Sequence, residues 1–459
     1  MQGRGSGQRK RRPVLVGCVA LAGMLVLAAC SSSTSSKASS SSATTSGVTG
    51  SFNWKRFSGQ TITVLAETQP WTDNIQPLTS QFESLTGIHV NWEIYTEEQR
   101  RQLAVVQMQS GRPSFDVFMN LKSFSGPQYS QAGWFENLYP YLDNKSLTSP
   151  TYDASDFLSG PWHSQILNGD LDGIPTNVEG PVLFYRTDLF KQYNITPPKT
   201  ISDVIKDAQL IEQRSNHQII GITSRGLPAA VAYTFGTFLH NYGGHWIVNG
   251  KSGVDTPAGI AALTAYTNML KTAGPPGVVS YNFLQSSTLF GQGKVAMEFD
   301  SSNELSDILK LANSTVANNF SVMEFPPGPG GEHPTVLSWS LAMSPYSKVK
   351  DAAWYFIQWA TSPSVQLQLA LKGIASPRAS TTKDPTYAAS LTGVRSAWIK
   401  ALDETLSQGN PNVGPPIVQQ AQARQIIGVM VDKVLLGQAT PQQAASSAAS
   451  QLDALKVGG

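Results

Sequence analysis

Strand and helix patterns alternate near the start of the chain, and this alternation constrains the fold more than any other feature of the sequence. Residues 59–66 predict a strand, and residues 88–95 predict another because apolar and polar side chains alternate there with a period of two. Helices are predicted at 77–86 and 97–110, each followed by a glycine, and a short apolar strand is predicted at 115–119. This order favours a parallel or mixed sheet covered by helices.

A second α/β unit follows the first. Val182 to Tyr185 and residues 219–224 predict strands, and a helix ending near Arg214 lies between them. The helix begins with Thr200-Ile201-Ser202-Asp203, the pattern of a capping box, in which a hydroxyl and a carboxylate satisfy free amides at a helix start. The sequence therefore predicts two α/β units in tandem.

The C-terminal part is predicted to be helical. Between Asp351 and Ala360 apolar residues recur at i, i+3, i+4 and i+7, which places them on one stripe of a helix, and helix is predicted from about Ser396 onward. A body of about 400 residues with this many aromatic and aliphatic side chains can bury a large core and normally divides into two domains.

The N-terminal segment has the pattern of a secretory signal. Val14 to Ala29 is an almost wholly apolar run of 16 residues, and all five basic residues of the first 29 precede it. A helix needs roughly 20 apolar residues to cross a bilayer, so this run is too short for an ordinary membrane anchor, which is the alternative. We therefore predict a signal peptide at residues 1–29.

The apolar run ends in Leu27-Ala28-Ala29-Cys30, which resembles the lipobox of bacterial lipoproteins. The resemblance implies cleavage before Cys30, diacylglycerol on its thiol, and an extracytoplasmic protein anchored to the cell membrane by that lipid. Residues 31–51 contain 15 Ser or Thr among 21 residues and cannot bury enough apolar surface to fold. Residues 30–51 are therefore predicted to be a lipidated, flexible tether.

Cleavage at this point would change the charge and the thiol content of the chain. Loss of five basic residues leaves 28 basic and 31 acidic residues, so the mature chain gives no support for nucleic-acid binding. The two cysteines are Cys18, inside the signal, and Cys30. The mature body has no further thiol, which excludes disulfides, thiolate metal sites and cysteine nucleophiles there.

No motif of a phosphate-binding loop or of a serine-hydrolase elbow is present. His240 and His245 are five residues apart with two glycines between them, a spacing that favours structural or surface roles over metal binding. We predict no metal, no cofactor and no catalytic residue. Carboxylate pairs leave one enzymatic alternative open, because a glycosidase needs only two carboxyl groups placed by the fold. Glu298 with Asp300, or Glu67 with Glu179, are such pairs.

Several segments together resemble the extracellular solute-binding lipoproteins of bacterial ABC importers, family 1, which includes maltose-binding protein. The matching segments, in order, are Gly173-Ile174-Pro175, Leu183 to Phe190, Pro197 to Thr200, Phe290 to Met297, Trp339 to Met343 before Ser347-Lys348, and Ala352 to Phe356. A finer resemblance, to the branch that binds sugar alcohols such as mannitol and sorbitol, lies in residues 274–283 and in Arg186.

The resemblance implies a two-lobe periplasmic-binding-protein-like α/β fold of type II, each lobe a mixed β-sheet flanked by helices, with a helical C-terminus. Lobe 1 is expected to comprise residues 52–176 and 337–390, and lobe 2 residues 177–336 and 391–459. The two lobes close over a ligand held in the cleft between them. The implied function is capture of a carbohydrate or sugar alcohol by a monomeric protein and its delivery to the permease subunits of an ABC importer.

Family positions also imply which residues contact the ligand. Polyhydroxylated ligands are bound by carboxylates, amides and guanidinium groups, with an aromatic ring against the carbon skeleton. The predicted ligand-binding residues are Glu67, Gln69, Asn120, Glu179, Tyr233, Asp300, Trp339 and Arg378.

Each of these residues also has an ordinary structural explanation. Trp339 would be a core residue, Asp300 and Asn120 would cap helices, and Glu179 would lie in a solvated turn. Arg225 and Arg378 both lie in predicted loops, from which a guanidinium group can reach the hydroxyls of a ligand. The ordinary alternative is an arginine exposed to solvent. At the level of function, a lipid-anchored glycoside hydrolase and a sugar-sensing or adhesion subunit with the same fold are the alternatives.

Overall fold

The computed structural model describes residues 50–311 and 316–455. The predicted signal peptide, Cys30 and nearly all of the predicted tether lie outside the described residues. Among the residues that are described, no helix has the length and apolar character needed to cross a membrane.

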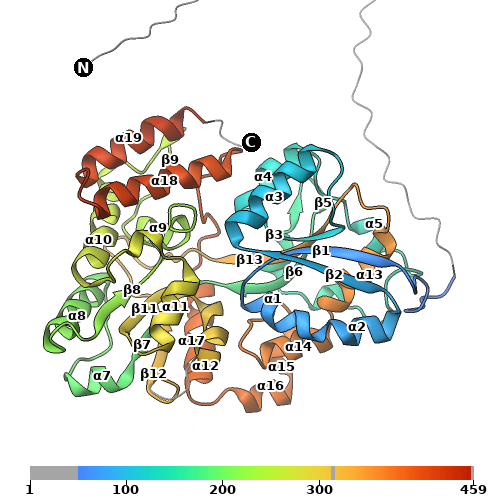
Figure 1. The fold of residues 1–459 in the computed structure, drawn as a ribbon, viewed down its shortest axis with the longest axis horizontal. Helices are drawn as coiled ribbons and strands as arrows, with labels where there is room; N and C mark the ends of the chain where they lie inside the picture. Colours follow the sequence, from blue (N-terminus) through green and yellow to red (C-terminus); the bar gives the residue numbers. More distant parts are fainter. Residues whose placement is uncertain (1–49, 312–315, 456–459) are drawn as a thin grey trace, which may run out of the picture. The chain divides into compact units, whose positions relative to one another are not determined.

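A five-stranded mixed sheet forms the first half of the fold, which we name lobe 1 (Figure 1). Its strands, in spatial order, are β2 (His89–Tyr95), β1 (Thr61–Glu67), β3 (Val117–Leu121), β13 (Leu337–Met343) and β6 (Ile174–Glu179). Strand β1 is parallel to both β2 and β3, whereas β13 is antiparallel to β3 and β6. The alternation predicted at the start of the chain is thus present, with the third strand two residues later than expected.

Helices cover both faces of this sheet. The lobe 1 helices are α1 (Pro70–Ile75), α2 (Thr79–Thr86), α3 (Glu97–Gln109), α4 (Lys122–Gln131), α5 (Tyr139–Leu142), α6 (Ser159–His163), α13 (Lys350–Ala360), α14 (Pro363–Ala370), α15 (Ala379–Lys383) and α16 (Pro385–Ser390). Residues of β1 alternate between two cores: Leu65 packs with α3 and α4, whereas Val64 packs with α1, α2 and α13. The stripe predicted on α13 is wider than expected, because every residue from Ala352 to Ala360 is buried.

A four-stranded mixed sheet forms the second half, which we name lobe 2. Its strands, in spatial order, are β12 (Phe320–Glu324), β7 (Pro181–Arg186), β11 (Val295–Ser301) and β8 (Ile220–Thr223). Strands β11 and β8 are parallel, and β7 is antiparallel to both β11 and β12.

Lobe 2 also has a core on each face of its sheet. The helices around it are α7 (Thr187–Gln192), α8 (Ile201–Arg214), α9 (Ala232–Asn241), α10 (Pro257–Ala273), α11 (Phe283–Gly291), α12 (Leu305–Leu311), α17 (Val394–Ser407), α18 (Gln420–Leu435) and α19 (Pro441–Asp453). Helices α8, α9, α10, α18 and α19 pack around one core, and α11, α12 and α17 around the other.

The two-residue strands β4 (Ile166–Leu167), β5 (Asp170–Leu171), β9 (Ile247–Val248) and β10 (Lys251–Ser252) form two small hairpins.

One local prediction needs correction. Helix is not continuous after Ser396, because residues 408–419 form a loop in which Pro415 and Pro416 lack the amide hydrogens a helix requires. At the start of α8 the Thr200 hydroxyl accepts from the Asp203 amide and the Asp203 carboxylate accepts from the Lys199 amide, so a hydroxyl and a carboxylate satisfy free amides there as predicted. The residue boundaries predicted for the lobes remain a prediction.

The chain passes from lobe 1 to lobe 2 through a single residue between β6 and β7, Gly180. A Cβ atom at this position would lie 2.4 Å from Cγ2 of Thr405 in α17, so only glycine fits. The end of β6 is therefore held against lobe 2, and this places Glu179 between the two sheets.

Candidate functional site

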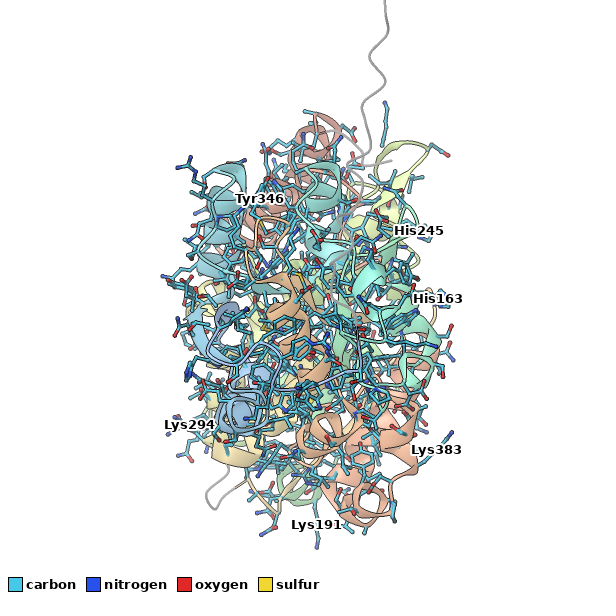
Figure 2. The ribbon with its side chains drawn as sticks, turned by 90° about the vertical axis from the view of Figure 1, so that its right-hand side faces the viewer. His163, Lys191, His245, Lys294, Tyr346 and Lys383 are labelled. Atoms are coloured by element: carbon cyan, nitrogen blue, oxygen red, sulfur yellow. The ribbon has the colours of Figure 1, made fainter. Side chains whose placement is uncertain are left out.

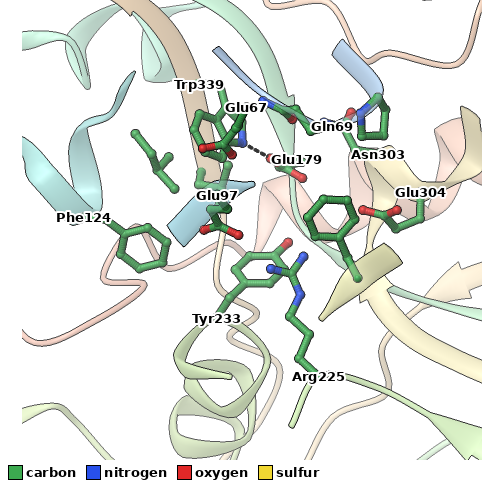
Figure 3. Close-up of a pocket in the computed structure, with 14 residues that line it drawn as sticks. Glu67, Gln69, Glu97, Phe124, Glu179, Arg225, Tyr233, Asn303, Glu304 and Trp339 are labelled. Atoms are coloured by element: carbon green, nitrogen blue, oxygen red, sulfur yellow. Dashed lines mark hydrogen bonds between the residues drawn. The ribbon is translucent and has the colours of Figure 1, made fainter. Parts of the chain in front are cut away.

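A cavity lies between the two lobes, and both contribute to its wall (Figure 3). Its volume is only about 30 Å³. The residues of the wall are Glu67, Gln69, Pro70, Glu97, Leu121, Phe124, Glu179, Leu337 and Trp339 from lobe 1, and Arg225, Tyr233, Phe283, Asn303 and Glu304 from lobe 2. The cavity is therefore narrow, rich in carboxyl groups and lined by aromatic rings.

Strand ends position the lobe 1 side chains. Glu67 is the last residue of β1 and Gln69 lies two residues beyond it, at the carboxyl end of the parallel strands β1, β2 and β3, where ligand clefts of α/β proteins form. The Glu67 carboxylate accepts a hydrogen bond from Nε of Arg100 at 3.0 Å, and both side chains are almost fully buried. Burial raises the pKa of Glu67 to about 7 against the opposing effect of Arg100.

Glu179 and Trp339 lie on the neighbouring strands β6 and β13. The indole Nε1 of Trp339 donates to one carboxyl oxygen of Glu179 (Figure 3), and the hydroxyl of Ser301, on β11 of lobe 2, donates to the other. Burial raises the pKa of Glu179 to about 7, although the hydrogen bond from Ser301 and the charge of Arg225 favour the ionised form. Trp339 is only 5% exposed, so it packs as a core residue while one side of it faces the cavity.

Arg225 supplies the guanidinium group of the wall, from the loop after β8. Its Nε and Nη2 atoms donate to the Asp300 carboxylate at distances of 2.6 to 3.0 Å. Its guanidinium also lies 4.9 Å from the ring centre of Tyr233 and 5.3 Å from that of Phe283. Asp300 is fully buried behind Arg225, so it holds the guanidinium in place and does not cap a helix.

Two further groups of the wall were not among the predicted ligand-binding residues. Asn303 is 1% exposed, and neither its amide nitrogen nor its amide oxygen has a hydrogen-bond partner among the described residues. Glu97, in the first turn of α3, pairs with Arg101 of the same helix and lies 3.6 Å from Arg424 of α18 in lobe 2. The guanidinium of Arg424 in turn lies 4.0 Å from the ring centre of Phe124.

The family model described as "Bacterial extracellular solute-binding protein" matches residues 66–367, which is more than half of the chain. The chain belongs to this family. The predicted family resemblance is thereby confirmed, and the protein is a solute-binding protein with its cavity between two lobes.

Individual relatives agree with this assignment. The erythritol/L-threitol-binding protein of Mycolicibacterium smegmatis is 30% identical over 371 residues, which cover 74% of this chain and 75% of the relative. The mannitol-binding protein of Pseudomonas aeruginosa is 26% identical, with coverage of 85% and 91%. The crystal structure of an ABC transporter solute-binding protein from Agrobacterium radiobacter K84 in complex with ribitol superimposes with a TM-score of 0.79 at 23% identity, covering 86% of this chain and 98% of that one. The predicted two-lobe fold is confirmed.

Six of the eight predicted ligand-binding residues lie at the cavity of this solute-binding protein. Five of them, Glu67, Gln69, Glu179, Tyr233 and Trp339, line it, and Asp300 supports its wall through Arg225. Of the carboxyl pairs considered for a glycosidase, Glu298 with Asp300 does not line the cavity, whereas Glu67 with Glu179 does.

The structure does not bring Asn120 and Arg378 to the cavity wall. Asn120 is fully buried within β3, where its carbonyl accepts from the Ser340 hydroxyl of β13. Arg378 is fully buried elsewhere in lobe 1, where it donates to the carbonyl of Asp153 at 2.6 Å and pairs with Asp156 at 3.1 Å. A loop sequence does not tell whether an arginine reaches a cleft or, as here, satisfies carbonyl groups inside its own lobe.

The histidines do not form a metal site. Among the described residues there is no cluster of three or more His, Cys, Asp or Glu side chains that could hold a metal ion. His240 is buried, with its ring nitrogens 3.2 Å and 3.0 Å from the carbonyl oxygens of Gly244 and Asn412. His245 is exposed and lies at the periphery of Figure 2, as the exposed Lys191 and Lys383 do.

The raised pKa of Glu179 predicts that the stability of the ligand-free protein depends on pH. The group titrates near 4.5 in the unfolded chain and near 7 in the folded protein, so its neutral form stabilises the fold fully below pH 4.5, and this contribution is lost as the pH rises to about 7. At 1.36 kcal/mol per pH unit, about 3 kcal/mol is lost over this interval. Glu179→Gln should flatten that part of the curve of unfolding free energy against pH, measured by urea unfolding. An unchanged slope would contradict the assignment.

Proposed function

We propose that this solute-binding protein captures a small sugar alcohol or sugar in the cavity between its lobes and delivers it to the permease of an ABC importer. The observation that carries the proposal is the composition of the cavity wall. Four carboxyl groups, two side-chain amides and one guanidinium converge on a space that is also bounded by aromatic rings. Such a wall can accept hydrogen bonds from several hydroxyl groups, donate to others and cover a carbon skeleton.

The dimensions of the cavity favour a slender ligand. Pockets for small molecules usually measure roughly 300–1,000 Å³, and the cavity here, at about 30 Å³, is far narrower. An unbranched polyol needs less width than a disaccharide, and the ligands named for the relatives, erythritol, L-threitol, mannitol and ribitol, are all unbranched polyols. We infer that the ligand belongs to the same chemical class.

The two lobes supply complementary chemistry. Glu67 and Glu179 from lobe 1 accept hydrogen bonds from hydroxyls, and Arg225 and Asn303 from lobe 2 donate to them. A ligand that contacts both sets is bound more tightly when the lobes are closed than when they are open, so binding favours closure. The closed protein is then the form that a permease would recognise.

A panel of ligands tests the proposal. Erythritol, L-threitol, ribitol and mannitol are added to the purified protein, with maltose and L-glutamate as comparisons, and the melting temperature is measured. We expect at least one of the polyols to raise it, because a ligand present at about 100 times its Kd adds about 2.7 kcal/mol of stability. Isothermal calorimetry then gives the affinity. A panel in which no polyol and no sugar changes the melting temperature would count against the proposal.

Trp339 is predicted to contact the carbon skeleton of the ligand. Trp339→Ala should weaken binding about tenfold or more, because it removes both the ring and the indole donor to Glu179. Trp339→Phe keeps an aromatic ring and should weaken ligand binding less than Trp339→Ala does. Trp162→Phe is the matched control, since Trp162 packs on Phe157, with ring centres 5.3 Å apart, and does not line the cavity. Equal affinities for Trp339→Ala and the control would contradict the prediction.

We also propose that Cys30 carries a lipid that anchors the protein to the outer side of the cell membrane. The support is the lipobox-like sequence that ends in Cys30 and the Ser/Thr-rich segment that follows it. The wild-type protein should be recovered in the membrane fraction and should incorporate labelled palmitate, whereas Cys30→Ala should do neither. Palmitate labelling that persists in the variant would contradict this assignment.

A further inference from the structure

Two buried carboxyl groups of lobe 2 meet at a single serine hydroxyl beside the cavity. Oγ of Ser287, on α11, lies 2.9 Å from Oε1 of Glu298, on β11, and 3.0 Å from Oε2 of Glu304, which immediately precedes α12. All three side chains are almost fully buried, and only Glu304 lines the cavity. Glu298 is thus linked to the cavity through Ser287 and Glu304 without touching it.

The number of hydrogen atoms at this contact fixes its charge. A serine hydroxyl has one hydrogen and can donate to only one of the two carboxyl groups. If both groups were ionised, the hydroxyl oxygen would face the other carboxylate with no hydrogen between them, in a site that water does not reach. One of the two carboxyl groups must therefore carry a proton that it donates to the Ser287 oxygen.

The second oxygen of Glu298 indicates which group is neutral. Oε2 of Glu298 is buried and has no hydrogen-bond partner among the described residues. Burying an unpaired carbonyl oxygen costs far less free energy than burying an unpaired carboxylate oxygen. Glu298 is therefore the carboxyl group that carries the proton. Glu304 lines the cavity, so groups of the wall or of a ligand can hydrogen-bond to its ionised carboxylate, which nothing described does for Oε2 of Glu298.

The charged groups around the pair agree with a shared proton. Burial raises the pKa of both Glu298 and Glu304 well above the ordinary value, and the nearby carboxylates Asp300, on β11, and Asp307, on α12, raise both pKa values further. Arg225 opposes these effects at both groups. Helix α11, which holds Ser287, has no ionisable side chain, and the residues opposite Glu298 on the neighbouring strands are Phe184 and Thr223.

We propose that Glu298 and Glu304 share one proton through Ser287, that the proton resides on Glu298, and that Glu298 thereby fixes Glu304 as a hydrogen-bond acceptor for the ligand. Neutral Glu298 donates to Ser287, and Ser287 donates to ionised Glu304. Glu298 is then a positioning residue that sets which hydroxyl orientation the cavity accepts. The part concerning the ligand rests on the proposed function, whereas the shared proton does not.

Infrared spectroscopy of the ligand-free protein tests the proton. At pH 8, where Glu67 and Glu179, each with a pKa of about 7, are mostly ionised, a band of a protonated carboxyl group should be present. It should disappear in Glu298→Gln, whose amide replaces the proton donor, and remain in Glu179→Gln as the matched control. Absence of the band from the wild type, or its survival in Glu298→Gln, would overturn the shared proton even if no ligand had been found.

Calorimetric titration with a ligand from the polyol panel tests where the proton resides. An amide mimics the neutral carboxyl group better than the ionised one, so Glu304→Gln should weaken binding about tenfold more than Glu298→Gln does. Ser287→Ala should also weaken binding, and Ser287→Thr, which restores the hydroxyl, should recover part of the loss. Melting curves of the ligand-free variants identify any that fail to fold. The reverse order of the two amide variants would place the proton on Glu304.

Discussion

The carboxyl group of Glu179 joins the two lobes at the ligand cavity, and the arrangement of the site depends on it. Glu179 ends β6 in the sheet of lobe 1, and only Gly180 separates it from β7 in lobe 2. Its oxygens accept hydrogen bonds from Trp339 of lobe 1 and Ser301 of lobe 2. Because both donors lie on strands, the sheets and not the loops fix the carboxyl group. A ligand that binds Glu179 contacts a group whose position both lobes determine.

Charged groups of the wall are paired with charges of opposite sign behind it, which explains how such a cavity can suit a neutral ligand. Arg100 forms an ion pair with Glu67 within lobe 1, and Asp300 forms an ion pair with the guanidinium of Arg225 in lobe 2. The pKa of Glu179 is raised to about 7, so part of its charge is removed by protonation near neutral pH. The hydroxyl groups of a polyol can then exchange hydrogen bonds with the wall without adding or removing a buried charge.

The sequence predicted those parts of the site that family position and strand ends indicate. Family position placed Glu67 and Gln69 at the end of the first predicted strand, and strand ends face the cleft in α/β folds. Glu304 and Asn303 reach the cavity from a turn between β11 and α12, and only the packing of lobe 2 against lobe 1 brings them there. Arg378 illustrates the same limit, because its loop gave no sign that carbonyl groups inside lobe 1 would surround its guanidinium.

Glu97 connects the ligand cavity to the contact between the lobes. Its Oε1 atom pairs with Arg101 of its own helix and approaches Arg424 of lobe 2, whose guanidinium also lies over the ring of Phe124. Glu97 and Phe124 line the cavity as well. A carboxylate has about four acceptor sites, so a ligand hydroxyl can bind Glu97 while both guanidinium groups stay in place. Ligand binding therefore adds to the contacts that hold the lobes together. The closed state is stabilised relative to the open state by the difference between the free energies with which the two states bind the ligand.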